Sequence, residues 1–302
     1  MTERKLAVGL DGRVCAIESG AYGARLHGTF SGYRTAGAEG VRGDNVKRAS
    51  HGMGRAAVSD VTRLDGVAHC APKAGSTPVA SAAGPLRLAA PAPFELWRID
   101  LDASASAEAL DTLAASERAR AERFALPRRR ARYLAARCGL RQILAARTGI
   151  EAGELRLREG PFGKPCLEGP PACAFSMSHS HDVALVALAD GGEIGVDVEV
   201  LRPVPDAVSL AALACTDAER AALARLAAGD RDRAFLLAWT RKEACLKALG
   251  SGLAIAPARL EVGLVPDPRT VAIGTPGGTV PVEVRSPSDD ARLVVSLARR
   301  VR

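Results

Sequence analysis

Gly195-Val196-Asp197-Val198-Glu199 is a run in which glycine and valine alternate with two carboxylates. Alternation with a period of two predicts a β-strand, because successive side chains on a strand point to opposite faces. Asp197 and Glu199 then share one face, about 6.6 Å apart along the backbone, while Val196 and Val198 are buried on the other face. We expect this strand to carry the two acids into a site.

The paired carboxylates indicate a metal site. Like charges held this close raise one another's pKa unless a cation lies between them, and oxygen ligands suit a hard cation such as Mg²⁺. The alternative is an ordinary solvated strand face. The Asp-x-Glu pattern alone does not decide between these interpretations.

The second motif is WTRKEACLK, at residues 239–247, in a strongly helical context. Glu243 and Lys247 are four residues apart, so one interpretation is an ordinary helix ion pair worth about 0.2–0.5 kcal/mol. The functional alternative makes Glu243 a third metal ligand or a general base. Lys242 and Lys247 would then offer ammonium groups to phosphate oxygens.

Two further motifs precede the acidic strand. FSMSHS, at residues 175–180, leaves hydroxyls and an imidazole together at the end of a predicted strand, where they could bind phosphate oxygens. It lacks the G-x-S-x-G elbow of α/β-hydrolases. GPFGKP, at residues 160–165, is not a Walker A loop, because its glycines are too close and Pro165 stands where Ser or Thr should bind magnesium.

Outward from these motifs, hydrophobic periodicity predicts an α+β chain of two similar α/β halves, divided near Gly191. One helix begins at Ser116 and is interrupted at Pro127, and a second ends at Gly149. Further helices are expected at 217–227 and 231–249, and strands at 94–101, 155–158, 174–177, 183–189, 194–200, 260–264 and 293–298.

Residues 1–93 differ from the rest of the chain. They are rich in Gly, Ala, Ser and Arg and show no sustained periodicity, which predicts a disordered or low-order N-terminal extension. An alternative is a start codon assigned too far upstream. Residues 74–93 are rich in Pro and Gly and are interpreted as a linker. We therefore expect an N-terminal half at 94–190 and a C-terminal half, with the magnesium site, at 191–302.

Composition limits the function classes. The 302 residues are 47% hydrophobic, enough for a sizeable core, and carry a net charge of +7. Residues 1–93 hold 12 Lys/Arg against 7 Asp/Glu and the remaining 209 hold 29 against 27, so the basic excess is no evidence for a nucleic-acid-binding fold. No run is long enough to span a membrane, and the seven cysteines show no C-x-x-C pair. A cytoplasmic protein with reduced thiols is expected.

The motifs together carry a resemblance. GKP (163–165), SHS (178–180), GVDVE (195–199) and WTRKEA-x-x-K (239–247) resemble those of the 4′-phosphopantetheinyl transferases of the surfactin-synthetase-activating type. The similarity covers about residues 94–264. It implies a pseudo-twofold fold with coenzyme A in the cleft between the two similar halves. It also implies Mg²⁺-dependent transfer of 4′-phosphopantetheine to a serine of an apo carrier protein, with release of 3′,5′-ADP.

The resemblance also implies residue roles. Asp197, Glu199 and Glu243 would be magnesium ligands, and Glu243 would also take the proton from the carrier serine. Lys247 would steady the charge on the departing 3′,5′-ADP. The sequence departs from the family at Ser176, where Asn is usual, which puts one hydrogen bond in question. The expected coenzyme contacts are Arg132, Lys164, Ser178, His179, Lys242 and Lys247.

The implied partners are acyl, peptidyl or aryl carrier protein domains, with no nucleic acid or membrane. The 209 residues from Phe94 onward favour the monomeric, broad-specificity type, which serves polyketide and nonribosomal peptide synthesis, over the short trimeric type. Arginines between 118 and 141 would receive an acidic carrier, or simply form a solvated helix face. Two other functions stay open: a metal-dependent phosphohydrolase and a basic nucleic-acid-binding protein.

Overall fold

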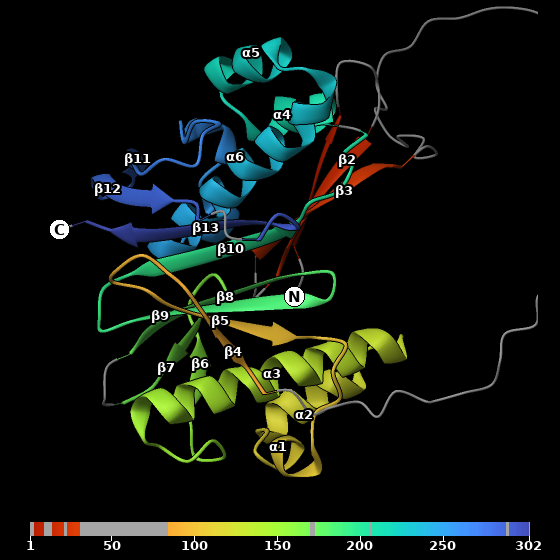
Figure 1. Ribbon diagram of the computed structural model, residues 1–302, viewed down its shortest axis with the longest axis vertical. Helices are drawn as coiled ribbons and strands as arrows, with labels where there is room; N and C mark the ends of the chain where they lie inside the picture. Colours follow the sequence, from red (N-terminus) through yellow and green to blue (C-terminus); the bar gives the residue numbers. More distant parts are fainter. Residues whose placement is uncertain are drawn as a thin grey trace, which may run out of the picture. The chain divides into compact units, whose positions relative to one another are not determined.

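The computed structural model describes residues 84–302, apart from 170–172, 206, 288–289 and 302, and the backbone of three strands nearer the N-terminus (Figure 1). These strands, β1 (Glu3–Val8), β2 (Val14–Gly20) and β3 (Gly23–Phe30), form an antiparallel sheet within the extension expected to have low order. Residues 31–83, the greater part of that extension, lie outside the described residues. The low order of the extension and the domain boundaries stay predictions.

The N-terminal half is a four-stranded antiparallel sheet with one long helix on its outer face. The strand order is β4 (Leu86–Leu88), β5 (Glu95–Asp100), β9 (Val183–Ala189), β8 (Ala174–Ser180). The helix is α3 (Pro127–Thr148), with proline in its first turn and Gly149 ending it in the left-handed conformation, at φ 73°. Leu140 and Leu144 of α3 pack with Val186 of β9 in one apolar core.

Smaller elements complete this half. Helices α1 (Ala107–Asp111) and α2 (Ala115–Glu122) precede α3, and the hairpin of β6 (Leu157–Glu159) and β7 (Pro165–Leu167) follows it. Leu86 to Leu88 pair with Leu96 to Arg98, so the ordered body includes a strand before Phe94.

The C-terminal half also consists of a four-stranded antiparallel sheet and one long helix. Its antiparallel sheet has the order β10 (Ile194–Val200), β13 (Leu293–Arg300), β12 (Gly278–Arg285), β11 (Arg269–Thr275), and α6 (Ala228–Leu249) covers it. Phe235 and Leu246 of α6 share an apolar core with Val282 and Val294. Helices α4 (Ala207–Ala214) and α5 (Asp217–Arg225) precede α6, and two short 3₁₀ turns, Gly252–Ala254 and Pro257–Arg259, follow it.

The two sheets pack face to face between the long helices, as Figure 1 shows. Val183, Leu185 and Ala187 of β9 share a core with Val196 and Val198 of β10. The α+β class is therefore confirmed. No helix among the described residues is both long and apolar enough to cross a bilayer.

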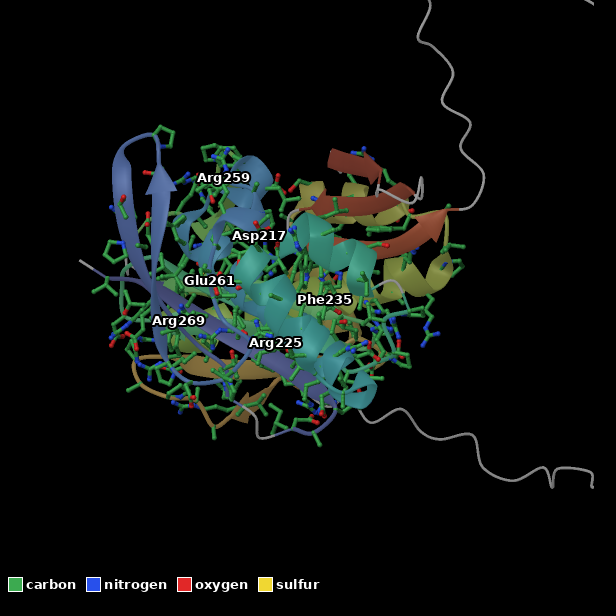
Figure 2. The ribbon with its side chains drawn as sticks, turned by 90° about the horizontal axis from the view of Figure 1, so that it is seen from above. Asp217, Arg225, Phe235, Arg259, Glu261 and Arg269 are labelled. Atoms are coloured by element: carbon green, nitrogen blue, oxygen red, sulfur yellow. The ribbon has the colours of Figure 1, made fainter. Side chains whose placement is uncertain are left out.

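The prediction of a strand at 260–264 is wrong, although buried apolar residues do alternate with other residues there. Leu260 and Val262 are buried, but Val262 N donates to Glu219 Oε1 at 2.9 Å and its carbonyl accepts from Arg241 Nε at 2.9 Å. Side chains therefore take the hydrogen bonds that a neighbouring strand would supply. Glu261, labelled in Figure 2, likewise accepts from Thr216 Oγ1, the cap of α5.

Candidate active site

Helix α6 lies directly against the face of β10 that carries the predicted acids. A Cβ on Gly195 would lie 2.0 Å from Ala244 O and 2.7 Å from Ala248 N, so glycine permits this close approach. Asp197 and Glu199 share this face with Gly195, because side chains alternate along a strand. Both are buried, 3% and 8% exposed.

Glu243 reaches the same interface from α6. Thr240 bonds Ser296, the residue paired with Asp197 on β13, and Lys247 bonds Asp197 itself. Glu243 lies between Thr240 and Lys247 on this helix face, because residues three and four apart are neighbours on a helix. Its side chain is buried. The strand acids and the helix acid therefore belong to one interface.

Asp197 is held by a hydroxyl and an ammonium. Ser178 Oγ and Lys247 Nζ each donate to Asp197 Oδ1 at 2.7 Å, and Lys247 Nζ also donates to Val196 O at 3.0 Å. Burial raises the pKa of Asp197, while Lys247 and Ser178 act in the opposite direction. A cation thus already stabilises this buried carboxylate.

Alternate serines of β8 join it to the edge of β10. Ser176 Oγ accepts from Val196 N at 3.1 Å, and Ser180 Oγ accepts from Val200 N at 3.2 Å and donates to Glu199 Oε2 at 2.8 Å. Ser176 therefore makes a hydrogen bond despite the missing Asn. Ser180 was not among the predicted site residues; the i, i+2, i+4 spacing of the three serines was the signal that could have identified it.

A second ammonium lies beside Lys247. Lys164 Nζ donates to Ile194 O at 2.8 Å, two residues along β10 from the carbonyl that Lys247 contacts. Burial lowers the pKa of Lys164, and the nearby charge of Lys247 lowers it further. Two ammonium groups at one strand edge form a positive region that suits phosphate oxygens.

Lys242 makes its contacts away from the edge of β10. Its side chain is fully buried, and Nζ lies 2.6 Å from Glu219 Oε2. Nζ also donates to Pro257 O at 3.0 Å and to Leu260 O. Lys242 is five residues from Lys247, so it points to another side of α6. These are the contacts of a buried structural ion pair, and the coenzyme contact predicted for Lys242 stays a prediction.

We expect Lys242→Met to destabilise the fold without weakening coenzyme binding. Removing one partner leaves Glu219 buried without its counter-charge, a change that typically costs about 3–5 kcal/mol. Chemical denaturation would measure the loss, and calorimetry with coenzyme A would test affinity. The double variant Lys242→Met/Glu219→Gln should recover only part of the loss, because both Glu219 oxygens also accept backbone N–H groups, from Val262 and Thr216, and an amide has one acceptor oxygen. A stable Lys242→Met protein with weakened coenzyme binding would contradict this role.

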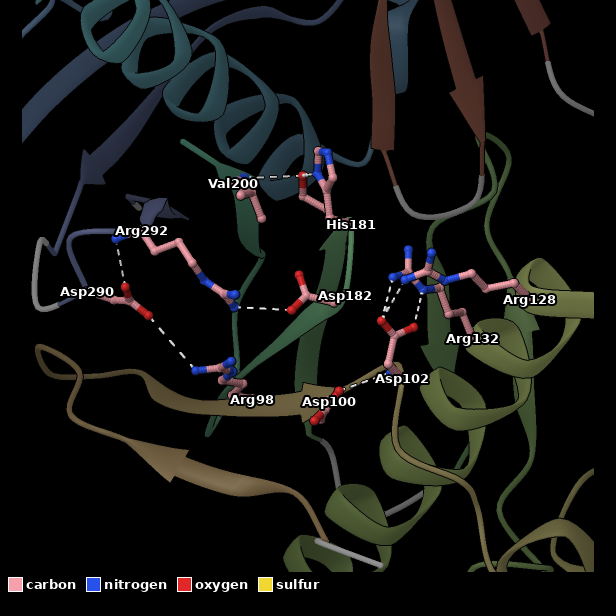
Figure 3. Close-up of polar contacts among 11 residues, drawn as sticks. Arg98, Asp100, Asp102, Arg128, Arg132, His181, Asp182, Val200, Asp290 and Arg292 are labelled. Carbon is pink, nitrogen blue, oxygen red and sulfur yellow. Dashed lines mark hydrogen bonds and ion pairs between the residues drawn. The ribbon is translucent and has the colours of Figure 1, made fainter. Parts of the chain in front are cut away.

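Arg132 and His179 lie on the side of the N-terminal half. Arg132 donates to Asp102 at 2.6 and 2.8 Å, and Arg128 donates to the same carboxylate at 2.9 Å (Figure 3). These arginines hold the pKa of Asp102 well below its usual range. His179 alternates with the serines, so it lies on the face of β8 that packs toward α3.

No group of three His, Cys, Asp or Glu side chains in the described part of the chain is close enough together to hold a metal ion. The donor chemistry nevertheless fits a hard divalent cation. Asp197 and Glu199 are buried oxygen donors on one face, and the Lys247 ammonium shows that Asp197 accepts a cation there.

A cavity of about 740 Å³ lies apart from this cluster. It is lined by residues of α2 and α3, by the loop between α3 and β6, and by Leu157 and Glu168, and none of the predicted site residues borders it. Its polar wall is Glu117, which accepts from Arg141 Nε at 2.8 Å and pairs with Arg137. These buried side chains bond to one another, and Arg141 also donates to Ala152 O and Leu155 O, so we look for the site at the edge of β10.

Comparisons with known proteins identify the family. A profile of the 4′-phosphopantetheinyl transferase superfamily matches residues 193–286, which include β10 and α6. The 4′-phosphopantetheinyl transferase HetI of Nostoc sp. is 38% identical over 176 residues, which are 57% of this chain and 74% of that protein. The chain belongs to the 4′-phosphopantetheinyl transferase family.

Two other relatives extend the similarity. The putative 4′-phosphopantetheinyl transferase slr0495 of Synechocystis sp. is 36% identical over 143 residues, 47% of this chain and 58% of that protein. The 4′-phosphopantetheinyl transferase ffp of Bacillus subtilis is 25% identical over 197 residues, 64% of this chain and 86% of that protein. The family transfers 4′-phosphopantetheine from coenzyme A to carrier proteins, and the comparisons support neither the phosphohydrolase nor the nucleic-acid alternative.

Proposed function

We propose that the edge of β10 is where this chain cleaves the diphosphate of coenzyme A and transfers phosphopantetheine to a carrier serine. The observation that supports it most is the convergence of two buried carboxylates and two ammonium groups there. Asp197 and Glu199 come from the strand, Lys247 from α6, and Lys164 from the loop that precedes β7. Diphosphate cleavage needs charge neutralisation and positioning of this kind.

We assign Asp197, Glu199 and Glu243 to hold Mg²⁺, which when bound would neutralise charge across the diphosphate. Lys164 and Lys247 would donate hydrogen bonds to the phosphate oxygens in place of the strand carbonyls they contact now. Ser178 would keep the Asp197 carboxylate oriented, as a second-layer hydrogen bond does for a metal ligand.

Glu243 would act as the base. The carrier serine loses its proton to Glu243 as its oxygen bonds to the phosphorus that bears pantetheine. The bond from that phosphorus to the bridging oxygen breaks, and 3′,5′-ADP leaves with the electron pair. Lys247 would stabilise the charge on that leaving group. Arg132 and His179 would bind parts of the coenzyme toward the N-terminal half, and Arg132 would exchange Asp102 for a phosphate.

We further propose the surfactin-synthetase-activating subtype, acting as a monomer on acyl, peptidyl or aryl carrier domains of polyketide and peptide synthesis in the cytoplasm. The similarity to the Bacillus subtilis relative over 86% of that protein supports the subtype. So does the presence in one chain of two halves, each with a 22-residue helix on a four-stranded sheet.

The direct test is mass spectrometry of an apo carrier protein incubated with the chain, coenzyme A and Mg²⁺. We expect a gain of one phosphopantetheine, abolished by Glu243→Ala and retained by Asp230→Ala. Asp230 is a matched control because it is exposed and lies on the same helix. If apo carriers from fatty-acid, polyketide and peptide synthesis all stayed unmodified, the proposed transfer activity would be contradicted. Release of phosphopantetheine without any acceptor would indicate a phosphohydrolase.

A further inference from the structure

The turn between β8 and β9 contains a residue in an unfavourable backbone conformation. Strand β8 ends at Ser180 and β9 begins at Val183, and these two residues are paired, so His181 and Asp182 form a two-residue turn. Among the described residues, His181 is the one non-glycine residue with a positive φ, 53°. Glycine is the residue that adopts this conformation without strain. A strained residue beside a functional site is a candidate for a functional role.

The His181 side chain connects to the acid pair through a single hydroxyl. Its Nδ1 lies 3.2 Å from Ser180 Oγ, which in turn lies 2.8 Å from Glu199 Oε2. Figure 3 shows His181 beside Val200. Val200 N donates to the same hydroxyl at 3.2 Å. The strained turn thus begins a short chain of hydrogen bonds that ends on a carboxylate of the site.

The direction of these bonds follows from counting protons. Ser180 has one hydroxyl hydrogen, and the ionised Glu199 carboxylate can only accept, so that hydrogen is donated to Glu199. Ser180 Oγ must then accept from its other partners. His181 Nδ1 therefore carries a hydrogen and donates it, which polarises the hydroxyl and strengthens the bond to Glu199.

We propose that His181 is a positioning residue that, acting through Ser180, orients the Glu199 carboxylate for the divalent cation. The inference rests on the proposed function of this site. Asp197 is fixed directly by Lys247 and Ser178, whereas the serine that fixes Glu199 is itself fixed by an imidazole. Groups bonded directly to a metal ligand, as Ser180 is to Glu199, typically change metal affinity 10- to 100-fold, and we expect His181 to act on the same bond.

The test is His181→Gly, because glycine suits the positive φ and the turn should fold at least as well. We expect an unchanged or raised melting temperature together with a 10- to 100-fold weaker affinity for Mn²⁺ or Mg²⁺, measured by calorimetry without coenzyme. His181→Asn should restore part of the affinity, since asparagine tolerates this conformation and its amide can donate. The Mg²⁺ concentration for half-maximal transfer should rise in parallel in His181→Gly.

A double-mutant cycle separates action through Ser180 from a general effect. Ser180→Ala should weaken cation binding, and adding His181→Gly to it should cause no further loss. Equal cation affinity in His181→Gly and the parent protein would overturn the proposal, and so would fully additive losses. A parent protein that neither binds the cation nor modifies a carrier would instead overturn the proposed function itself.

Discussion

Asp197→Asn is expected to lower the rate constant of phosphopantetheine transfer by about 10²–10³-fold, the usual effect of removing one preorganised charge-stabilising group. The amide keeps the shape of the side chain but loses the charge that holds Lys247 and would hold the cation. Stability should fall as well, because the amide leaves the largely buried Lys247 ammonium without its counter-charge.

Two measurements check this prediction: single-turnover transfer to an apo carrier, and thermal unfolding at pH 7. Asp290→Asn is the matched control, since this carboxylate is partly exposed and pairs with Arg98. If Asp197→Asn transferred phosphopantetheine at the parent rate, the proposed role of Asp197 in the site would be wrong.

Local periodicity was sufficient to predict the elements that carry the site. The bounds of β9 and β10 match their apolar and alternating runs, because side chains inside a sheet are sorted by face. The same alternation placed Asp197 and Glu199 together. For these residues the sequence pattern and the tertiary contact have one physical cause.

Residues whose partners are distant in sequence could not be placed this way. Lys242 and Lys247 look alike in the helix motif, and their different roles depend on Glu219 and Asp197, which belong to other elements. Arg132 likewise donates hydrogen bonds to Asp102, which lies 30 residues away in the sequence. Sequence spacing on one helix predicts which face a side chain lies on, but it does not predict which charged residue of another element pairs with it.

The hairpin of β11 and β12 was missed because Pro281 interrupts its pattern. An inner strand such as β12 forms hydrogen bonds with a neighbour on each side, and proline lacks the N–H that such a bond requires. The register accommodates the proline: β12 pairs with β13 only from Val282 to Arg285, and Pro281 lies at the end of that ladder, where its carbonyl accepts from Val301 N at 3.0 Å and no N–H is required of it. A tertiary offset of this kind leaves no local signal.

Gly195→Ala is expected to cause the largest structural loss. Its Cβ would lie 2.0 Å from Ala244 O and 2.7 Å from Ala248 N, both backbone atoms that no rotamer change can move. Helix α6 must therefore shift away from β10, at a cost near or above the upper end of the about 1–3 kcal/mol typical of overpacking. The shift would carry Glu243 and Lys247 away from Asp197, so transfer should fall even in the folded fraction.

Chemical denaturation and single-turnover transfer, each compared with Gly191→Ala, would test this coupling. Gly191 lies in the connection between β9 and β10, and a Cβ there meets nothing within 4 Å, so its variant should match the parent protein in both measurements. If Gly195→Ala were as stable and as active as Gly191→Ala, α6 would not lie against β10 as described. The acid of the helix and the acids of the strand would then lack the contact that brings them into one site.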